Sequence, residues 1–340
     1  MSIIKDYVIV QPKSKIKAGE GLIEGKYKFF TSSNTQTKWL NEFYYDKPAL
    51  ILGTGGMASV HYCDTPFSTS TDCIVMYAKD STNLEYIYHY LESHMEVLED
   101  GFKGAGLKHI SKDYILNIQI PEKELLEQKK IVDLCNNIDL IVAASKKQLE
   151  KLDELVKARF IEMFGDPKCN DKGFATVLGE SLFKLSNGKT LPNSKRFSKG
   201  IPAYGGNGIS WYTDEVLCDY DTIIVGRVGF QSGNVHLAKA PLWVTDNAMF
   251  ISNINSKDCD IRFLCTLMEH IDFTRYQDAG DLKKITQKPF MQMQYLMPPI
   301  DLQKQYIDFV EQTDKSKFEV QQSLEKLETL KKSLMQQYFG

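Results

Sequence analysis

Residue types that carry catalysis are present in this chain, but their spacing forms none of the common reactive motifs. The glycine-rich stretches GTGGMAS at 53–59 and YGGNG at 204–208 lack the G-x-G-x-x-G spacing of a nucleotide-binding turn, and there is no Walker lysine motif. The run MPPI at 297–300 lacks the polar first residue and the aromatic last residue of the Asn-Pro-Pro-aromatic signature of amino-methylating DNA enzymes. No G-x-S-x-G elbow is present. We therefore expect a chain without catalytic residues of its own.

The histidines and cysteines also lack the spacing of a metal site. His61 and His236 each follow a valine in a strand-like stretch, and neither has a second His or a Cys nearby at ligand spacing. The seven cysteines are an odd number and include no C-x-x-C pair. The sequence predicts no metal, no cofactor in this chain and no structural disulfide. For the two histidines it predicts paired structural roles.

Polar side chains that could bind nucleic acid gather in loops, such as FFTSSNTQTKW at 29–39 and GRVGFQSGN at 226–234. Asn and Gln can form two hydrogen bonds with adenine, and Lys can reach a phosphate or guanine. For any one of these residues, solvation or turn formation is the more probable explanation. As a set they are better candidates than the strands, because loops on a rigid frame commonly carry recognition. The candidates for DNA contact are Ser32, Asn34, Gln36, Lys38, Thr54, Lys103, Lys108, His109, Asn207, Arg227, Gln231, Lys283 and Lys284.

Composition limits what the loops can do alone. The 340 residues are 43% hydrophobic and 25% charged, which is typical of a globular protein, and the net charge is -3. Isolated DNA-binding domains are usually basic, so DNA affinity would have to come from local clusters or from partners. No apolar run approaches the roughly 20 residues that span a bilayer, and the N-terminus has no long apolar signal-peptide core. We expect a cytoplasmic protein without a membrane segment.

The elements that must position these loops occur twice. An offset of 175 residues, the distance from Gly165 to Gly340, pairs LEKLDELVKARFIEMFG at 149–165 with LEKLETLKKSLMQQYFG at 324–340. The same offset also pairs His61 with His236 in sequence that is otherwise less similar. A match over this much chain at one offset indicates a tandem duplication.

Each copy follows the same order of elements. Short apolar runs rich in Val, Ile and aromatic residues predict strands, and they precede short helical segments and then a proline. The predicted strands lie at 47–53, 72–78, 221–229 and 247–254, and the short helical segments at 83–100 and 261–273. The proline in each copy is followed by a long helix. We expect an α+β fold with two tandem domains of mixed β structure and short helices.

The long helices show heptad spacing with an imperfect seam. The seam follows Leu134, Ile138, Ile141, Ser145, Gln148, Leu152 and Leu155 in copy one, and Phe309, Thr313, Ser316, Val320, Ser323, Leu327 and Leu330 in copy two. A single amphipathic helix packed on its own domain would explain one such pattern. Two helices of about 35 to 40 residues would be about 50 to 60 Å long, too long for one small domain to cover, so they most simply cover each other. The residues expected to pair the helices are Leu134, Ile138, Ile141, Leu152, Leu155, Phe309, Val320, Leu327 and Leu330.

The chain divides into four expected segments: a first domain at 1–124, a long helix at 125–165, a second domain at 166–299 and a second long helix at 300–340. Gly165 and Pro167 form a helix stop, because Gly suits a left-handed cap and Pro cannot continue the helix. A parallel helix pair would place both domains at the same end. An antiparallel pair, which we expect, would place them at opposite ends with an approximate twofold relation.

Several segments resemble the DNA specificity subunit of type I restriction-modification systems. They are KARFIEMFGDP at 157–167, PEKELLEQKKIV at 121–132 with its counterpart PPIDLQKQYID at 298–308, and GAGLKHIS at 104–111 with AGDLKKIT at 279–286. The resemblance covers the whole chain in two copies, including the alternation of domain and long helix.

The resemblance implies a function for each part. The two domains would be target recognition domains, each reading one half of a bipartite site in double-stranded DNA, and the antiparallel coiled coil would set the spacer between the halves. The partners would be two methyltransferase subunits, which use S-adenosylmethionine for DNA methylation, and, for cleavage, translocating restriction subunits acting in phage defence. The chain itself would be non-catalytic.

Two other functions remain as alternatives. A duplicated protein-binding scaffold or inhibitor could dimerise through its coiled coil without reading DNA. A methyltransferase fused to its own recognition domain is disfavoured by the missing motifs. Co-purification with a methyltransferase subunit would distinguish the specificity subunit from the scaffold.

Overall fold

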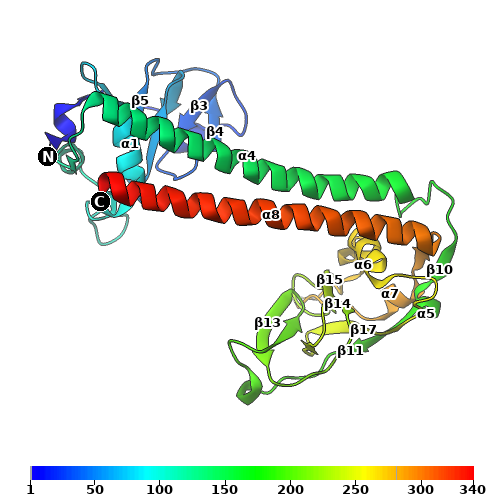
Figure 1. Cartoon of the computed structure of the whole chain (residues 1–340). Coiled ribbons are helices and arrows are strands. Elements are labelled where there is room, and N and C mark those ends of the chain that lie inside the picture. The colour runs from blue at the N-terminus through cyan, green and yellow to red at the C-terminus, as the bar shows by residue number, and fades with distance from the viewer. Residues whose placement is uncertain (1, 281) are drawn as a thin grey trace. The chain divides into compact units, whose positions relative to one another are not determined.

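The computed structural model describes residues 2–280 and 282–340, and its contacts divide the chain into two compact units. Unit 1 contains the chain up to Lys147 together with Val320–Gly340, and unit 2 contains Gln148–Glu319. Figure 1 traces the elements along the chain by colour. Two long helices, α4 (Leu125–Phe164) and α8 (Ile300–Phe339), each contribute residues to both units. The division of the chain into compact units therefore cuts through both long helices.

Unit 1 contains three small sheets, one of which is the two-stranded antiparallel sheet β1-β9. The four-stranded antiparallel sheet has the order β2-β8-β5-β6, and the three-stranded sheet has the order β4-β3-β7 with β3 and β7 parallel. The strands are β1 (Ser2–Ile3), β2 (Val8–Val10), β3 (Tyr27–Phe30), β4 (Lys38–Leu40), β5 (Ala49–Gly53), β6 (Val60–Cys63), β7 (Phe67–Thr69), β8 (Cys73–Ala78) and β9 (Gln119–Ile120). The short helices are η1 (Ile4–Asp6), η2 (Ala18–Glu20), α1 (Leu84–Ser93), α2 (Met95–Glu99) and α3 (Lys112–Leu116).

Unit 2 repeats this topology strand for strand. Its sheets have the orders β11-β17-β14-β15 and β13-β12-β16, again with one parallel pair in the smaller sheet. The strands are β10 (Thr176–Leu178), β11 (Phe183–Asn187), β12 (Ile201–Gly205), β13 (Gly208–Thr213), β14 (Thr222–Gly226), β15 (Val235–Ala238), β16 (Trp243–Val244), β17 (Ala248–Ile254) and β18 (Gln294–Leu296). The short helices are α5 (Gly179–Leu182), η3 (Asn193–Lys195), α6 (Ile261–Glu269), η4 (Thr274–Tyr276) and α7 (Lys288–Gln292). The shared topology supports the predicted duplication.

The central strands explain why these segments form sheets. β5 (ALILG) and β14 (TIIVG) are buried at every position, so both faces of each strand are covered. Continuous apolar runs with β-branched residues suit strands of this kind. Each central strand ends at a glycine, Gly53 or Gly226, after which a loop leaves the core. The candidate DNA contacts at Thr54 and Arg227 follow directly.

Within each unit, a part of α4 runs antiparallel to a part of α8. In unit 1, Asp139 binds Lys331 at 2.6 Å and Lys146 lies 3.7 Å from Glu328. In unit 2, Asp153 binds Lys317 at 2.6 Å, and further along α4 the ring of Phe160 contacts Tyr306. Residue numbers fall along one helix as they rise along the other. The predicted α+β fold with antiparallel helices is therefore confirmed.

The phase of the predicted helix seam needs correction. Ile141, Leu155 and Leu330 are 50%, 47% and 48% exposed, so they lie outside the pairing face. Ile138, Leu152, Val320 and Leu327 are buried or half-buried, and Leu134 and Phe309 are half-buried beside the seam. The covered positions in α4 are Ile131, Cys135, Ile138, Val142, Ser145, Leu149, Leu152 and Val156, and those in α8 are Tyr306, Val310, Thr313, Lys317, Val320, Leu324, Leu327 and Lys331. Each series keeps alternating steps of four and three, but their order is reversed. From Ile138 to Ser145, for example, the covered residue between them is Val142 rather than the expected Ile141.

The last turns of the long helices complete the cores of the units. Phe339, near the end of α8, contacts Tyr86 and Tyr90 in unit 1 with ring centroids 5.2 and 5.7 Å apart. Phe160 and Phe164, near the end of α4, are fully buried in unit 2. Each unit is thus covered by the helix end from the other sequence repeat. The exchange of helix ends agrees with the expected antiparallel pair, whereas the division of each helix between two units did not follow from the sequence.

The end of α4 is shaped by Gly165. Its φ of +75° is in the left-handed region, and its N–H donates to the carbonyl of Ile161 at 2.8 Å. A Cβ at this position would collide with the carboxylate of Asp171. Glycine therefore ends the helix both by conformation and by space, as the Gly-Asp-Pro sequence predicted. None of the helices among the described residues is long and apolar enough to cross a bilayer.

Candidate nucleic-acid interface

In unit 1, the loop after β5 pairs with a segment about 50 residues further along the chain. The N–H of Gly56 donates to the carbonyl of Lys108, and the N–H of Ile110 donates to the carbonyl of Thr54, both at 3.1 Å. His109 Nδ1 lies 3.1 Å from the same Thr54 oxygen. Lys103 and His109 exchange two backbone hydrogen bonds of 3.0 Å. These contacts bring together four of the predicted sites: Thr54, Lys103, Lys108 and His109.

The loop at 31–37 joins the same region through Ser32. Its hydroxyl donates to the carbonyl of Asp72 at 2.7 Å, and Thr54 Oγ1 donates to that oxygen at 3.0 Å. His61 Nε2 donates to the carbonyl of Ser33 at 2.7 Å. Asn34 is exposed beside these residues. Ser32 and Asn34 therefore belong to one surface with Thr54.

Lys38 and Gln36 are held by local backbone groups. The ammonium of Lys38, on β4, donates to the carbonyl of Ala18 at 2.7 Å. Gln36 donates its side-chain amide to the carbonyl of Lys38. These contacts give both side chains a structural role that the sequence did not indicate, and a DNA contact would have to compete with it.

Unit 2 repeats the backbone arrangement of unit 1 with different side chains. The N–H of Gly229 donates to the carbonyl of Lys283 at 2.8 Å, and the N–H of Ile285 donates to the carbonyl of Arg227 at 3.0 Å. A guanidinium nitrogen of Arg227 also lies 3.4 Å from the carbonyl of Asp246. The predicted residues Arg227, Lys283 and Lys284 are thus brought together as their counterparts are in unit 1.

Two further predicted residues of unit 2 lie on exposed turns. Asn207 is in the turn between β12 and β13, and the preceding Gly206 packs so closely that a Cβ there would lie 3.4 Å from the Cα of Gly226. Gln231 is exposed in the loop after β14, and its backbone carbonyl accepts a hydrogen bond from Asn234 at 3.1 Å. Both turns therefore lie against the end of the central strand, and both side chains face solvent.

Two lysines near this surface in unit 1 were not predicted. A surface hollow of about 420 Å³ is lined by Lys13 and Lys112 as well as by Thr54 and His109. The two lysines are far from Thr54 in sequence and belong to no motif, so only the fold shows that they meet. Lys13 and Lys112 add positive charge beside the predicted contacts.

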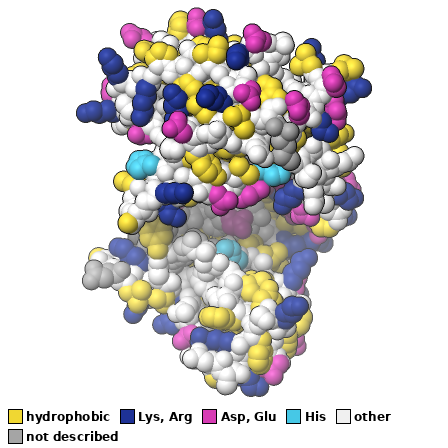
Figure 2. Space-filling view, turned by 90° about the vertical axis from the view of Figure 1, so that its left-hand side faces the viewer, with side chains coloured by type: hydrophobic (Ala, Val, Ile, Leu, Met, Phe, Trp, Pro, Cys, Tyr) yellow, Lys and Arg dark blue, Asp and Glu magenta, His cyan; other side chains and the backbone are white. Residues whose placement is uncertain are grey.

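Charge on the visible surface is mixed. Figure 2 shows Lys and Arg side chains interspersed with Asp and Glu, without a large face of one sign. Burial lowers the pKa of His61 and of His236, which favours neutral imidazoles. Positive charge near the loops therefore comes from lysines and Arg227 rather than from these histidines.

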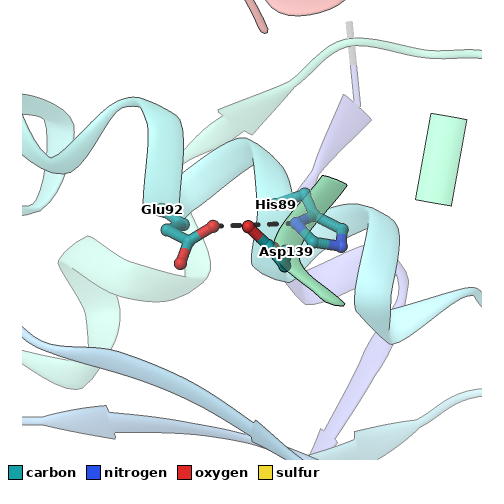
Figure 3. A group of neighbouring side chains, drawn as sticks. All are labelled: His89, Glu92 and Asp139. Carbon is teal, nitrogen blue, oxygen red and sulfur yellow. Dashed lines mark ion pairs between the residues drawn. The ribbon is translucent and has the colours of Figure 1, made fainter. Parts of the chain in front are cut away.

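One group of side chains has the composition of a metal site. Ligand atoms of His89, Glu92 and Asp139 lie within 4.8 Å of one another, and Figure 3 shows the three side chains directed toward one another. The ammonium of Lys331 already lies 2.6 Å from Asp139 and 3.2 Å from Glu92. A metal ion would have to displace this lysine. The positive charge that neutralises the two carboxylates is therefore the ammonium of Lys331, on α8.

The charge of Glu92 agrees with this arrangement. Burial would raise its pKa, but contacts with His89, Lys331 and Tyr88 lower the pKa to about 2. The corresponding carboxyl on α6, Glu269, has its pKa raised by burial. At the position equivalent to Lys331, α4 carries Val156, which packs against the core of unit 2. The ion-pair cluster is thus a feature of unit 1.

The chain belongs to the type I restriction modification DNA specificity domain family, whose model matches residues 4–154 and 172–331. Among curated proteins, it is 21% identical to the EcoDI specificity subunit of Escherichia coli, with 96% of this chain and 84% of the relative covered. It is 20% identical to the Escherichia coli EcoprrI specificity subunit, with 66% of this chain and 59% of the relative covered. A match of 29% identity to the MjaVIII specificity subunit of Methanocaldococcus jannaschii covers 26% of this chain and 21% of that protein.

Solved structures share the fold. The S subunit of a type I restriction-modification system from M. genitalium has a TM-score of 0.74 at 16% identity, covering 100% of this chain and 95% of that one. A chain from a study of complex assembly and conformational transition in the type I system has a TM-score of 0.58 at 12% identity, with 98% and 96% covered. The suspected family is therefore confirmed, and with it the presence of two recognition domains.

Proposed function

We propose that this chain is the DNA sequence-recognition subunit of a type I restriction-modification complex. Each unit would read one half of a bipartite site in double-stranded DNA. The observation that carries the proposal is the repeated loop arrangement, in which the same pair of backbone hydrogen bonds holds polar and basic side chains at the end of β5 and of β14. Different side chains on a common backbone, such as Thr54 and Arg227, suit the reading of two different half-sites.

The long helices suit a spacing role. A helix of 40 residues is about 60 Å long, and half-sites on one face of DNA are separated by about 34 to 36 Å for each helical turn. Because both helices contribute to both units, the helix pair is the natural determinant of spacer length.

The chemistry would belong to partner subunits. The complex would contain two methyltransferase subunits, which bind S-adenosylmethionine, and, for cleavage, restriction subunits, while this chain stays non-catalytic. Partners that contact phosphates would offset the lack of a strongly basic face on this subunit. Because the complex would act on chromosomal and invading DNA, we expect it in the cytoplasm. Its role there would be defence against phage.

Long-read methylation sequencing tests the proposal. The gene would be expressed with its methyltransferase subunit in a host that lacks other adenine methyltransferases, and the same host without this gene would be the control. We expect a new two-part motif carrying N6-methyladenine that depends on this chain. If the two proteins co-purify but no new motif is methylated, the chain is a protein-binding scaffold and the proposal is wrong.

A further inference from the structure

The loop tips of both units expose large apolar side chains at equivalent positions. In GTGGMAS and GRVGFQS, a glycine with φ of +85° or +97° directly precedes Met57 or Phe230, which are 73% and 91% exposed. The facing segments contribute Leu107 and Leu282, which are 77% and 57% exposed. Exposure of single apolar residues is common, but repetition at equivalent positions in two diverged domains needs an explanation.

Backbone hydrogen bonds place the two residues of each set beside a bonded position. The N–H of Gly56 donates to the carbonyl of Lys108, and Met57 and Leu107 are the next residues beyond these two. In unit 2, the N–H of Gly229 donates to the carbonyl of Lys283, and Phe230 and Leu282 are the next residues beyond them. We call Met57 with Leu107, and Phe230 with Leu282, the apolar tips.

Lysines adjoin both tips. Lys108 follows Leu107, and Lys283 and Lys284 follow Leu282. The cores of protein interfaces are depleted of charged residues, so a methyltransferase surface is a poor match for this combination. Duplex DNA matches it, because base faces are apolar and phosphates lie on either side of them. Proteins that distort DNA commonly insert Phe, Leu, Ile or Met side chains between base pairs.

We propose that the apolar tips insert against the bases of the two half-sites and unstack a base step in each, while the adjoining lysines bind the flanking phosphates. This inference rests on the proposed function. Phe230 has an aromatic ring that can stack on an exposed base, and Met57 does not. The half-site read by unit 2 is therefore the more strongly unstacked of the two.

The test uses the complex with its methyltransferase subunits and duplexes carrying the methylated motif. 2-Aminopurine reports unstacking by its fluorescence, and it is placed at successive positions of each half-site other than the methylated adenine, which methyltransferases flip out of the duplex themselves. The variants are Met57→Ala with Leu107→Ala, and Phe230→Ala with Leu282→Ala. The controls are Phe43→Ala and Val216→Ala, both 48% exposed and both preceding the central strands, at the ends opposite the loops.

We expect wild-type complex to raise the fluorescence at one position of each half-site. Each tip variant should abolish the rise at its own half-site and weaken specific binding by about tenfold or more, because burial of two apolar side chains is lost. The controls should leave both unchanged. Circular dichroism and co-purification with the methyltransferase establish that the variants are folded and assembled.

Three outcomes would overturn the inference. If wild-type complex methylates the motif but no probe responds and the tip variants bind DNA normally, the tips do not insert and the proposed function stands. If the tip variants lose the methyltransferase subunit, the tips are a protein interface. If wild-type complex neither binds nor methylates a specific site, the proposed function has failed and the inference fails with it.

Discussion

At the scale of single residues, the covered positions of the two helices differ in the same way at two equivalent pairs, Lys331 with Val156 and Lys317 with Val142. Lys331 is 23% exposed and sits between Glu92 and Asp139, whereas Val156 packs against apolar neighbours. A lysine on a helix-pairing face is costly to bury unless carboxylates meet it. The cluster in unit 1 therefore ties the end of α8 to α1 and to α4 by charge, while unit 2 uses apolar packing at the same place.

Replacing this lysine should weaken unit 1. Lys331→Met leaves two partly buried carboxylates without their cation, and we expect a loss of about 1 to 2 kcal/mol in the free energy of unfolding at neutral pH, a value reduced for the solvent exposure of Glu92 and Asp139. Lys332→Met, at the exposed neighbouring position, is the control and should have little effect. Urea denaturation measures both. Equal stability of the two variants would contradict the role of Lys331.

Acid should have a related effect. The pKa of Glu92 in the folded protein is lowered to about 2 from the ordinary 4.5, so its ion pairs stabilise the fold above about pH 4.5 and this stabilisation is lost as the pH falls toward 2. Lys331→Met removes one cause of the lowered pKa. We therefore expect the gap in stability between wild type and this variant to narrow between pH 4.5 and 2, as measured by urea unfolding across the pH range. A gap that widened on acidification would have the wrong sign.

At the scale of elements, the last turn of α4 should contribute more to the stability of unit 2 than to the stability of its own sequence repeat. Phe164 is fully buried against Phe263 and Tyr306, so Phe164→Ala should cost about 3 to 5 kcal/mol of unfolding free energy. Ile161→Ala changes a 44% exposed residue one turn earlier and should cost little. Hydrogen exchange, read by peptide, would place the lost protection in unit 2. Loss confined to unit 1 would refute the exchange of helix ends.

The sequence predicted the elements better than their contacts. The long helices, the central strands and the Gly165 stop follow from local signals that need no partner. The helix seam was misplaced by one residue at Ile141, Leu155 and Leu330 because those apolar residues lie on the outer face, while the true seam includes Lys331. A lysine in a sequence is normally assigned to the surface. The carboxylates that allow Lys331 to be partly buried, Glu92 and Asp139, are distant in sequence.

In the candidate interface, too, the sequence predicted residues but not the contacts between them. Thr54, Lys108 and His109 were selected as polar residues in separate loops, and the fold brings them together through hydrogen bonds between distant backbone groups. Backbone pairing of this kind carries no side-chain signature, so no spacing rule could have predicted it. Lys13 and Lys112 were missed for that reason. Lys38 was selected as a contact, but its ammonium is bound to the carbonyl of Ala18.

At the scale of the whole molecule, duplication provides two recognition surfaces, and both long helices contribute residues to both units. The two units share topology and loop hydrogen bonds but differ in the side chains that those bonds present. Under the proposed function, half-site sequence and spacer length are then controlled by separate parts of the chain, the loops and the helices. This separation has a direct consequence for engineered variants.

Lengthening both helices should change the spacer alone. Seven residues of heptad pattern inserted after Lys147 in α4 and after Glu319 in α8 preserve the seam and add about 10.5 Å to each helix, the length of about three base pairs. We expect methylation sequencing to return the same two half-sites with a spacer about three base pairs longer. Insertion in one helix only is the control, because it breaks the register between α4 and α8 and should abolish specific methylation. A double-insertion variant that methylates the original motif with its original spacer would show that the helices do not set the distance between the half-sites.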